Sequence, residues 1–250
     1  MGLYPVFLSL VSATGLAGAT WWEKLVTVFL PELWRIVKLL LGGLSGTGMI
    51  FALTLLFSIP LGILVMFCRR SRFAPLRVLT TFYISVMRGT PLMLQLVVFY
   101  YAPYYFFKIM MNKMPENWLF LALIVGFSIN YAAYFAEIFR SGLSSIAVGQ
   151  YEAANVLDFG RMRTFLHIIL PQMVKNVLPS VTNEMITLVK DTSLAFTLSY
   201  VEMFTLARQE SALMVSPMPL FVAGIFYYVA NLVVAFVMAR VEKKFDYYHV

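Results

Sequence analysis

The sequence predicts an all-α protein that crosses a membrane several times. Of its 250 residues, 61% are hydrophobic and 12% are charged, whereas a typical soluble domain is about 45–50% apolar and about 25% charged. The apolar residues form long runs: residues 39–68, 117–136 and 211–239 carry no charge, and residues 78–107 carry only Arg88. Each run reaches the roughly 20 residues that a helix needs to cross about 30 Å of hydrocarbon. Weak alternation argues against a β-barrel, whose strands have a period of two.

Five membrane-spanning helices are predicted, at about residues 44–68, 78–102, 118–138, 180–204 and 216–239. Four of them follow the apolar runs directly. The fourth span, 180–204, is less obvious because it contains Glu184, Lys190, Asp191 and Glu202. Its length and the helical spacing of its apolar positions still favour a span.

Residues 1–43 are predicted to form an N-terminal extension. Residues 21–41 mix Trp and Leu with charged residues at helical spacing, which is typical of an interfacial elbow helix that leads into the first span. Residues 3–20 are apolar and end in Ala17-Gly18-Ala19, which resembles a signal-peptide cleavage site, but no basic region precedes them. An additional span at residues 3–20, which would reverse the N-terminus, stays open as an alternative.

The basic residues predict the orientation, because cytoplasmic loops carry an excess of Lys and Arg. Eleven lie after the first span, after the third span and in the tail, against six in the N-terminal segment and the other two loops. This count places the N-terminus outside and the C-terminus in the cytoplasm. The net charge of +7 is therefore assigned to topology and not to nucleic-acid binding. The eleven residues are Arg69, Arg70, Arg72, Arg77, Arg140, Arg161, Arg163, Lys175, Arg240, Lys243 and Lys244.

Charged residues at membrane depth usually face a bundle interior, an ion pair or a water-filled path. Arg88 opens the segment RGTPL, in which Gly89 and Pro91 weaken the helix and free carbonyl groups that need new partners. Lys190 and Asp191 are expected near the middle of the fourth span. They stay open to two interpretations, a structural ion pair or a contact with a polar solute.

No enzyme class fits the sequence. Residues 43–48 resemble a phosphate loop, but Met49 and Ile50 stand where such a loop needs Lys and Ser or Thr, so helix packing by small residues is expected instead. His167 and His249 are the only histidines, and both lie in predicted cytoplasmic segments. The single Cys68 excludes an intrachain disulfide and a Cys-based metal cage. We expect neither a nucleotide site nor a metal site in this chain.

The predicted cytoplasmic loop 141–179 contains a short helical pattern. In YEAANVLD, Glu152, Asn155 and Asp158 recur at steps of three. Such steps drift by about 60° on a helix of 3.6 residues per turn. The pattern therefore predicts a helix of two or three turns and a change of direction near Gly160. Such a helix either docks a soluble partner or belongs to a solvated connection, and the periodicity leaves both open.

Several motifs resemble those of a known family. Glu152-Ala153-Ala154, followed by Ile168 and Leu170-Pro171, resembles the EAA loop of bacterial ATP-binding-cassette (ABC) importer permeases. The family's glycine, six residues after the glutamate, is Asp158 here, and Gly160 lies two positions later. The likeness covers residues 44–244. Further motifs are similar to the polar amino-acid branch of the family: RGTPL at 88–92 with Gln95, the segment Asn130–Arg140, LPQ at 170–172 and KDTSL at 190–194.

The resemblance implies the five-helix core of a type I ABC importer permease in the bacterial inner membrane, paired as a homo- or heterodimer. It also implies separate ATPase subunits that bind ATP and Mg²⁺, and an extracytoplasmic amino-acid-binding protein. The cargo stays open among acidic, basic and neutral amino acids and cystine. An ATP-independent channel or secondary carrier for a small polar solute is the alternative. The expected ATPase-docking residues are Glu152, Ala153, Ala154, Asn155, Asp158 and Gly160, and the expected path or gate residues are Arg88, Gln95, Asn130, Glu137, Lys190, Asp191 and Thr192.

Overall fold

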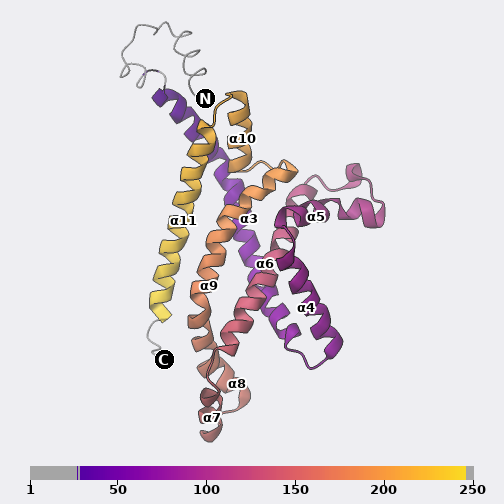
Figure 1. Cartoon of the computed structure of the whole chain (residues 1–250), viewed down its shortest axis with the longest axis vertical. Helices are drawn as coiled ribbons and strands as arrows, with labels where there is room; N and C mark the ends of the chain where they lie inside the picture. The colour runs from indigo at the N-terminus through magenta and orange to yellow at the C-terminus, as the bar shows by residue number, and fades with distance from the viewer. Residues whose placement is uncertain (1–26, 28, 246–250) are drawn as a thin grey trace. The chain divides into compact units, whose positions relative to one another are not determined.

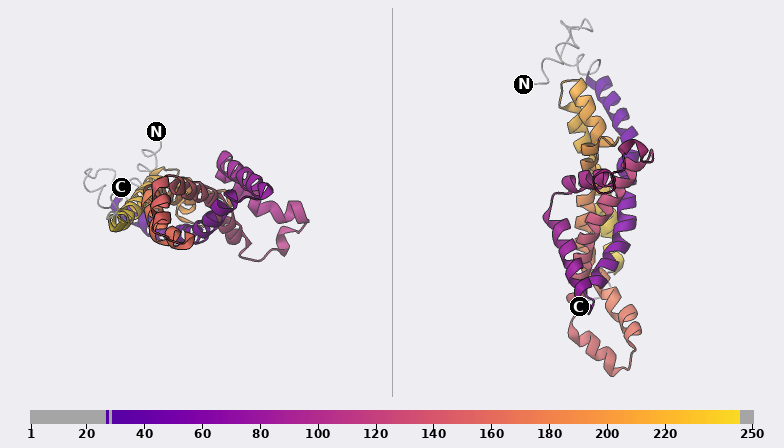
Figure 2. Two further views of the ribbon diagram at one scale, coloured as in Figure 1. Left: turned by 90° about the horizontal axis from the view of Figure 1, so that it is seen from below. Right: turned by 90° about the vertical axis from the view of Figure 1, so that its right-hand side faces the viewer.

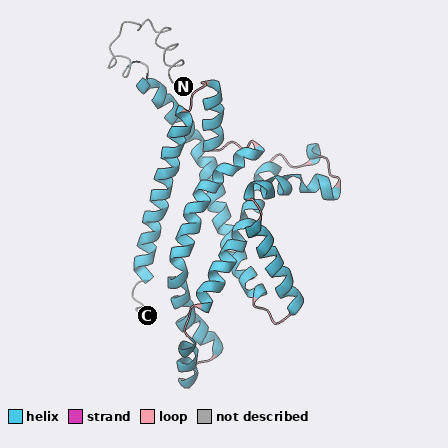
Figure 3. Ribbon diagram, in the orientation of Figure 1, coloured by secondary structure: helices cyan, strands magenta, loops and turns pink. Residues whose placement is uncertain are grey.

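The computed structural model describes residue 27 and residues 29–245, and this part of the chain is helical without strands (Figures 1 and 3). The all-α prediction is confirmed. The possible span at residues 3–20 and the beginning of the predicted elbow helix lie outside the described residues. The helices are α3 (Leu30–Arg69), α4 (Ala74–Gly89), α5 (Leu92–Phe107), α6 (Trp118–Ser144), α7 (Val148–Val156), α8 (Arg161–Thr164), α9 (Leu170–Asp191), α10 (Met203–Leu213) and α11 (Met218–Phe245), with 3₁₀ turns at Met111–Lys113 and Thr192–Leu198 and a π turn at Phe165–Ile169.

The five predicted spans correspond to α3, the pair α4–α5, α6, α9 and α11. Helices α3, α6 and α11 are each long and apolar enough to cross a membrane, and α4 and α5 meet this criterion only together. The 22 residues of α9 extend for about 33 Å at about 1.5 Å per residue. Its charged residues keep its hydropathy low, but its length is sufficient for a span.

The first span differs from the prediction because no helix break separates it from the segment before it. Residues 30–69 form one helix of 40 residues, so a separate interfacial helix that ends near residue 41 is wrong for the described part. Gly43 and Gly46 inside α3 allow close packing, as expected for small residues. A Cβ atom at Gly43 would lie 2.7 Å from the Met203 Cα atom, and one at Gly46 would lie 2.8 Å from the Val201 carbonyl oxygen.

The fourth span also differs, since a continuous helix over 180–204 is wrong. Helix α9 begins at Leu170 and ends at Asp191, so Lys190 lies at the end of the helix and not at its middle. The chain then continues through a 3₁₀ turn to Ser199, which has the left-handed φ of 57°.

A new helix, α10, begins at Met203, before the predicted fourth span ends. The carboxylate of Glu202 caps α10 by accepting hydrogen bonds from the backbone N–H groups of Phe204 (2.7 Å) and Thr205 (2.6 Å). Side-chain caps of this kind satisfy amide groups that have no partner at a helix start. Residues 203 and 204, which the apolar spacing assigned to the fourth span, therefore belong to a separate helix.

The remaining spans agree with the prediction more closely. Helix α6 begins at Trp118, as predicted, and ends six residues later than residue 138, at Ser144. Helix α11 extends from Met218 to Phe245 and so continues beyond residue 239. Most of α6 is buried, including Phe127, Phe135 and Asn130, which makes α6 the central helix of its unit.

The chain divides into two compact units, residues 1–50 with 189–230 and residues 51–188 with 231–250. The described part of the first unit has its own apolar core, formed by Ile36, Leu40, Met203, Ala207, Val222 and Ala223. In the second unit, the end of α3, the helices α7 and α8, and the end of α11 lie at the same end (Figures 1 and 2). The three basic segments that the charge count assigned to one side therefore lie together. The side of the membrane that they face stays a prediction.

Candidate functional site

The first polar feature of the second unit is the break between α4 and α5. The two helices meet at an angle of 115°. Thr90 is extended, with φ −121° and ψ 150°, and Pro91 has no amide hydrogen to donate. The last carbonyl groups of α4 therefore lose their partners within the helix, as the sequence predicted.

Two buried side-chain amides replace those partners. The Gln95 Nε2 atom donates to the carbonyl oxygens of Met87 (3.0 Å) and Thr90 (3.2 Å) and to the Thr90 hydroxyl (2.7 Å). The Asn130 Nδ2 atom, on α6, donates to the Gln95 Oε1 atom (2.8 Å) and to the Met87 carbonyl oxygen (3.1 Å). Gln95 and Asn130, which the sequence suggested as path or gate residues, thus hold the bend in place. We call Met87, Thr90, Gln95 and Asn130 the bend network.

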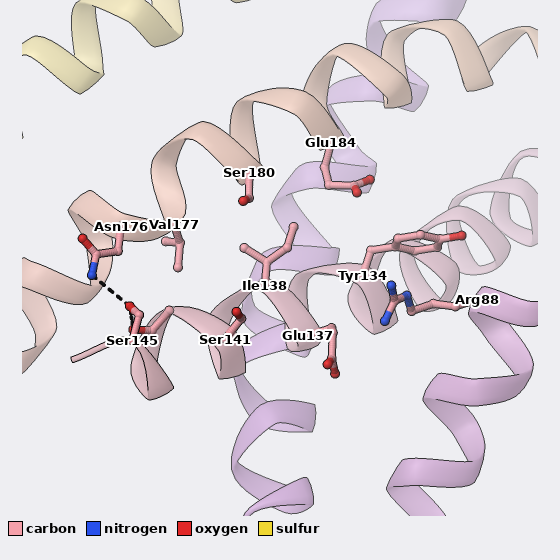
Figure 4. Close-up of a pocket in the computed structure, with 11 residues that line it drawn as sticks. Arg88, Tyr134, Glu137, Ile138, Ser141, Ser145, Asn176, Val177, Ser180 and Glu184 are labelled. Carbon is pink, nitrogen blue, oxygen red and sulfur yellow. Dashed lines mark hydrogen bonds between the residues drawn. The ribbon is translucent and has the colours of Figure 1, made fainter. Parts of the chain in front are cut away.

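A polar cavity of about 430 Å³ lies beside the bend network, between α6 and α9. Figure 4 shows Ser180 and Glu184 of α9 pointing toward Ile138 and Tyr134 of α6. The Arg88 guanidinium lies 5.4 Å from the centre of the Tyr134 ring, at a distance typical of a cation–π contact. The cavity is lined by Arg88, Tyr134, Glu137, Ile138, Ser141, Gly142, Ser145, Asn176, Val177, Ser180 and Glu184.

Glu137 joins this cavity to the end of α3. Its carboxylate pairs with Arg140, at 2.6 Å, and with Arg69 of α3. All three side chains are partly buried, so the shared carboxylate ties α3 to α6 where solvent screening is reduced. Arg88 and Glu137, two of the predicted path residues, both line this cavity.

The predicted docking segment forms α7, a helix of nine residues. Glu152, Ala153 and Asn155 are exposed, whereas Ala154 is buried against the unit. Val156 and Leu157 are 85% and 65% exposed, so α7 presents a carboxylate and large apolar side chains on one short helix. Figures 1 and 2 show α7 and α8 at the far end of the second unit.

The turn after α7 stays at the position of the family's glycine. Asp158 has the left-handed φ of 54°, which glycine adopts most readily and which Asp tolerates better than most residues. Gly160 has an ordinary φ of −59° and precedes α8. The departure from the motif therefore changes the residue at the turn and leaves the turn where the family has it.

The other three predicted path residues belong to the first unit. Lys190 is exposed and Asp191 is half-buried at the end of α9. Thr192 is fully buried, and its hydroxyl donates to the Val189 carbonyl oxygen at 2.7 Å. These residues surround the transition from α9 to the 3₁₀ turn.

Residues 58–247 match the family described as "Binding-protein-dependent transport system inner membrane component". The chain belongs to this family. The resemblance to ABC importer permeases is thereby confirmed.

Individual relatives agree with this assignment. The arginine transport system permease protein ArtQ of Bacillus subtilis is 34% identical over 210 residues, which cover 83% of this chain and 93% of ArtQ. The putative glutamine transport system permease protein GlnP of Rickettsia felis is 32% identical over 193 residues, which cover 77% and 86%. The crystal structure of an amino acid ABC transporter with histidines superimposes with a TM-score of 0.77 at 26% identity, covering 87% of this chain and 99% of that one.

The structure of this permease also contains cavity residues that the sequence reasoning missed. On α9, Asn176, Ser180 and Glu184 recur at steps of four, a spacing that places them on one helix face. Tyr134, Ser141 and Ser145 on α6 have the same kind of spacing. This spacing is visible in the sequence. The predicted fourth span begins at residue 180, however, so the prediction assigned Asn176 to the preceding loop.

Proposed function

We propose that this permease imports a polar amino acid across the inner membrane of a bacterium and that α7 docks a separate ATPase. ATP and Mg²⁺ would be bound by that ATPase and not by this chain. Further partners are a second permease subunit, as a homo- or heterodimer, and an extracytoplasmic amino-acid-binding protein. The N-terminus lies outside and the C-terminus lies in the cytoplasm.

The observation that carries the docking proposal is the surface of α7. Val156 at the end of α7 and Leu157 directly after it are largely exposed at the far end of the second unit, and adjacent exposed apolar side chains are a common feature of partner-binding surfaces. They are accompanied by the exposed carboxylate of Glu152. Apolar anchors beside a charge, on a helix of two to three turns, suit insertion of the helix into a groove of a partner. The basic residues at the same end support a cytoplasmic location for this partner.

The cavity between α6 and α9 supports an amino-acid cargo. Its volume of about 430 Å³ is within the range of about 300–1,000 Å³ that small-molecule pockets occupy. Arg88 offers a cation for a carboxylate, and Glu184 offers a carboxylate for an ammonium group, with hydroxyl and amide groups among the lining residues. A zwitterionic ligand matches both signs of charge. The names of the relatives, which specify glutamine and arginine transport, support the same class of cargo.

The docking proposal is tested by reversing the charge of Glu152. The Glu152→Arg variant is expected to lose co-purification with the ATPase and to lose uptake. Glu116→Arg is the matched control, because Glu116 is also an exposed glutamate of the second unit but lies outside the docking segment. If Glu152→Arg keeps both the ATPase and ATP-dependent uptake, docking through α7 is wrong. If no ATPase co-purifies with the wild type and uptake continues without ATP, the alternative of a channel or secondary carrier takes its place.

The cargo is tested by competition. Uptake of a radiolabelled amino acid mixture by reconstituted importer, in the presence of each of the twenty amino acids and cystine, ranks the ligands. Arg88→Gln is expected to reduce uptake while the ATPase stays bound, because Arg88 lies in the cavity and not on α7. Arg77→Gln, which removes an exposed arginine from the same helix α4, is the control.

A further inference from the structure

We propose that a second cavity, at the end of the second unit that carries α7, binds the phosphate headgroup of an anionic phospholipid. This cavity of about 450 Å³ lies between the end of α3, the end of α6, α7 and α8. It shares no lining residue with the polar cavity that contains Arg88. The inference goes beyond the import of an amino acid and does not depend on the identity of the cargo.

The polar lining of this cavity suits a phosphate group. Arg70 and Arg161 both line it, together with the Tyr151 hydroxyl and the Asn155 amide. Guanidinium, hydroxyl and amide N–H groups are the usual donors to phosphate oxygens. The described lining includes no Asp or Glu. The headgroup of an anionic phospholipid supplies acceptors that match these donors.

The two arginines differ from Arg69, Arg140 and Arg163 at this end of the unit. Arg69 and Arg140 pair with Glu137, and Arg163 stacks on the Phe159 ring at 4.6 Å. Within the described part of the chain, neither Arg70 nor Arg161 has a carboxylate partner. Two guanidinium groups that converge on one cavity repel each other unless an anion lies between them.

The apolar wall of the cavity distinguishes a lipid from free phosphate. Phe67 and Phe165 line the cavity beside the polar groups. Phe67 is half-exposed and continues an exposed apolar stripe of α3 that includes Phe57 and Leu64. Residues at these spacings lie on one face of a helix, so the stripe leads from the membrane-spanning part of α3 directly to the cavity. An acyl chain along this stripe would leave the headgroup beside the arginines, as in basic pockets that bind anionic lipids between membrane helices.

The test measures lipid retention by the detergent-solubilised permease–ATPase complex with native mass spectrometry. The probes are dioctanoyl phosphatidylglycerol, dioctanoyl phosphatidylcholine and inorganic phosphate. The wild type is expected to retain phosphatidylglycerol in preference to phosphatidylcholine. Each surface arginine adds about fivefold to the affinity for an anionic lipid, so the double variant Arg70→Gln/Arg161→Gln is expected to bind about 30-fold more weakly. The matched control is Arg72→Gln/Arg77→Gln, which removes two exposed arginines nearby that do not line the cavity.

Thermal unfolding distinguishes a loss of lipid binding from a folding defect of the double variant. Phosphatidylglycerol is expected to raise the thermal unfolding temperature of the wild type and of the control but not that of the double variant. Equal loss of lipid in both double variants would show a general charge effect and overturn the proposal. Displacement of the lipid by inorganic phosphate at equal concentration would identify free phosphate as the ligand. Unchanged lipid binding with loss of the ATPase from Arg70→Gln/Arg161→Gln would show that an acidic side chain of the ATPase occupies the cavity, which also overturns the proposal.

Discussion

Replacing Asn130 with Leu removes the side chain that links α6 to the bend between α4 and α5. Asn130 is 3% exposed and Gln95 is 8% exposed, so water cannot take over their hydrogen bonds. Leu has the same branching at Cγ as Asn and a high helix propensity, so α6 itself is expected to stay helical. The variant therefore isolates the contribution of the amide group to the bend network.

The magnitude follows from the two hydrogen bonds that Asn130 donates. The Met87 carbonyl oxygen keeps a partner in the Gln95 Nε2 atom at 3.0 Å, whereas the Gln95 Oε1 atom loses its only described donor. Hydrogen bonds between membrane helices contribute about 0.6–1.7 kcal/mol each, and a buried acceptor without a partner costs about 1–3 kcal/mol. We expect Asn130→Leu to lower the free energy of unfolding by about 2–3 kcal/mol. In a Gln95→Leu background the same change is expected to cost about 1 kcal/mol, because only the Met87 contact is then lost.

The assay is a double-mutant cycle measured by unfolding in mixed micelles with an increasing fraction of sodium dodecyl sulfate. Nitroxide labels at the exposed positions 79 and 106, in a Cys68→Ser background, report the angle between α4 and α5 through the distance between the labels. Loss of the bend network is expected to broaden this distance distribution. The role assigned to Asn130 would be refuted if two results came together. The effects of Asn130→Leu and Gln95→Leu on the free energy of unfolding would add within about 0.5 kcal/mol, and the distribution of distances between the labels would be unchanged.

Three further predictions use the same unfolding assay. Gly142→Ala is expected to lower the free energy of unfolding by about 1–3 kcal/mol, because its Cβ atom would lie 2.0 Å from the Val177 Cγ1 atom. The control Gly224→Ala, where no atom lies within 4 Å, should leave the free energy of unfolding unchanged. Equal destabilisation by the two substitutions would contradict the contact with Val177. Asp158→Val is expected to be about 1–2 kcal/mol less stable than Asp158→Gly, since φ is 54° at this turn; equal stability of the two variants would argue against a left-handed turn. Glu202→Gln is expected to cost about 2–3 kcal/mol, because an amide group then faces N–H and O–H donors, and a loss below about 0.5 kcal/mol would disprove the cap.

The sequence allowed most of the fold to be predicted because lipid imposes a strong length and polarity rule. Helices α6 and α11 begin within two residues of the spans predicted from the uncharged runs, and the bend at Pro91 follows from the loss of one amide donor. The short helix α7 follows from steps of three that cannot continue on a helix.

The differences arise where a single contact decides the local structure. The start of α10 depends on Glu202, whose carboxylate accepts hydrogen bonds from α10 and from the Tyr227 hydroxyl at 3.0 Å, and Tyr227 lies 25 positions away in the chain. At Gly43, α3 lies directly against the backbone of Met203, where a Cβ atom would be 2.7 Å from the Met203 Cα atom. Neither partner is visible from local spacing. The polar face of α9 was detectable from its steps of four, but only after the correct helix start had been placed.

The position of α6 has a mechanical consequence for this permease. Asn130 holds the bend network, Glu137 holds Arg69 and Arg140, and Gly142 accommodates Val177 of α9. The Glu137–Arg140 pair lies within α6, but a slip of α6 by one residue along its axis, about 1.5 Å, would displace its contacts with the bend network, with Arg69 and with Val177 at the same time. Intermediate positions of α6 would therefore lose several interactions without gaining others. During a transport cycle α6 should thus move with its neighbouring helices as one rigid body. The flexible segments that the cycle needs must then lie outside α6.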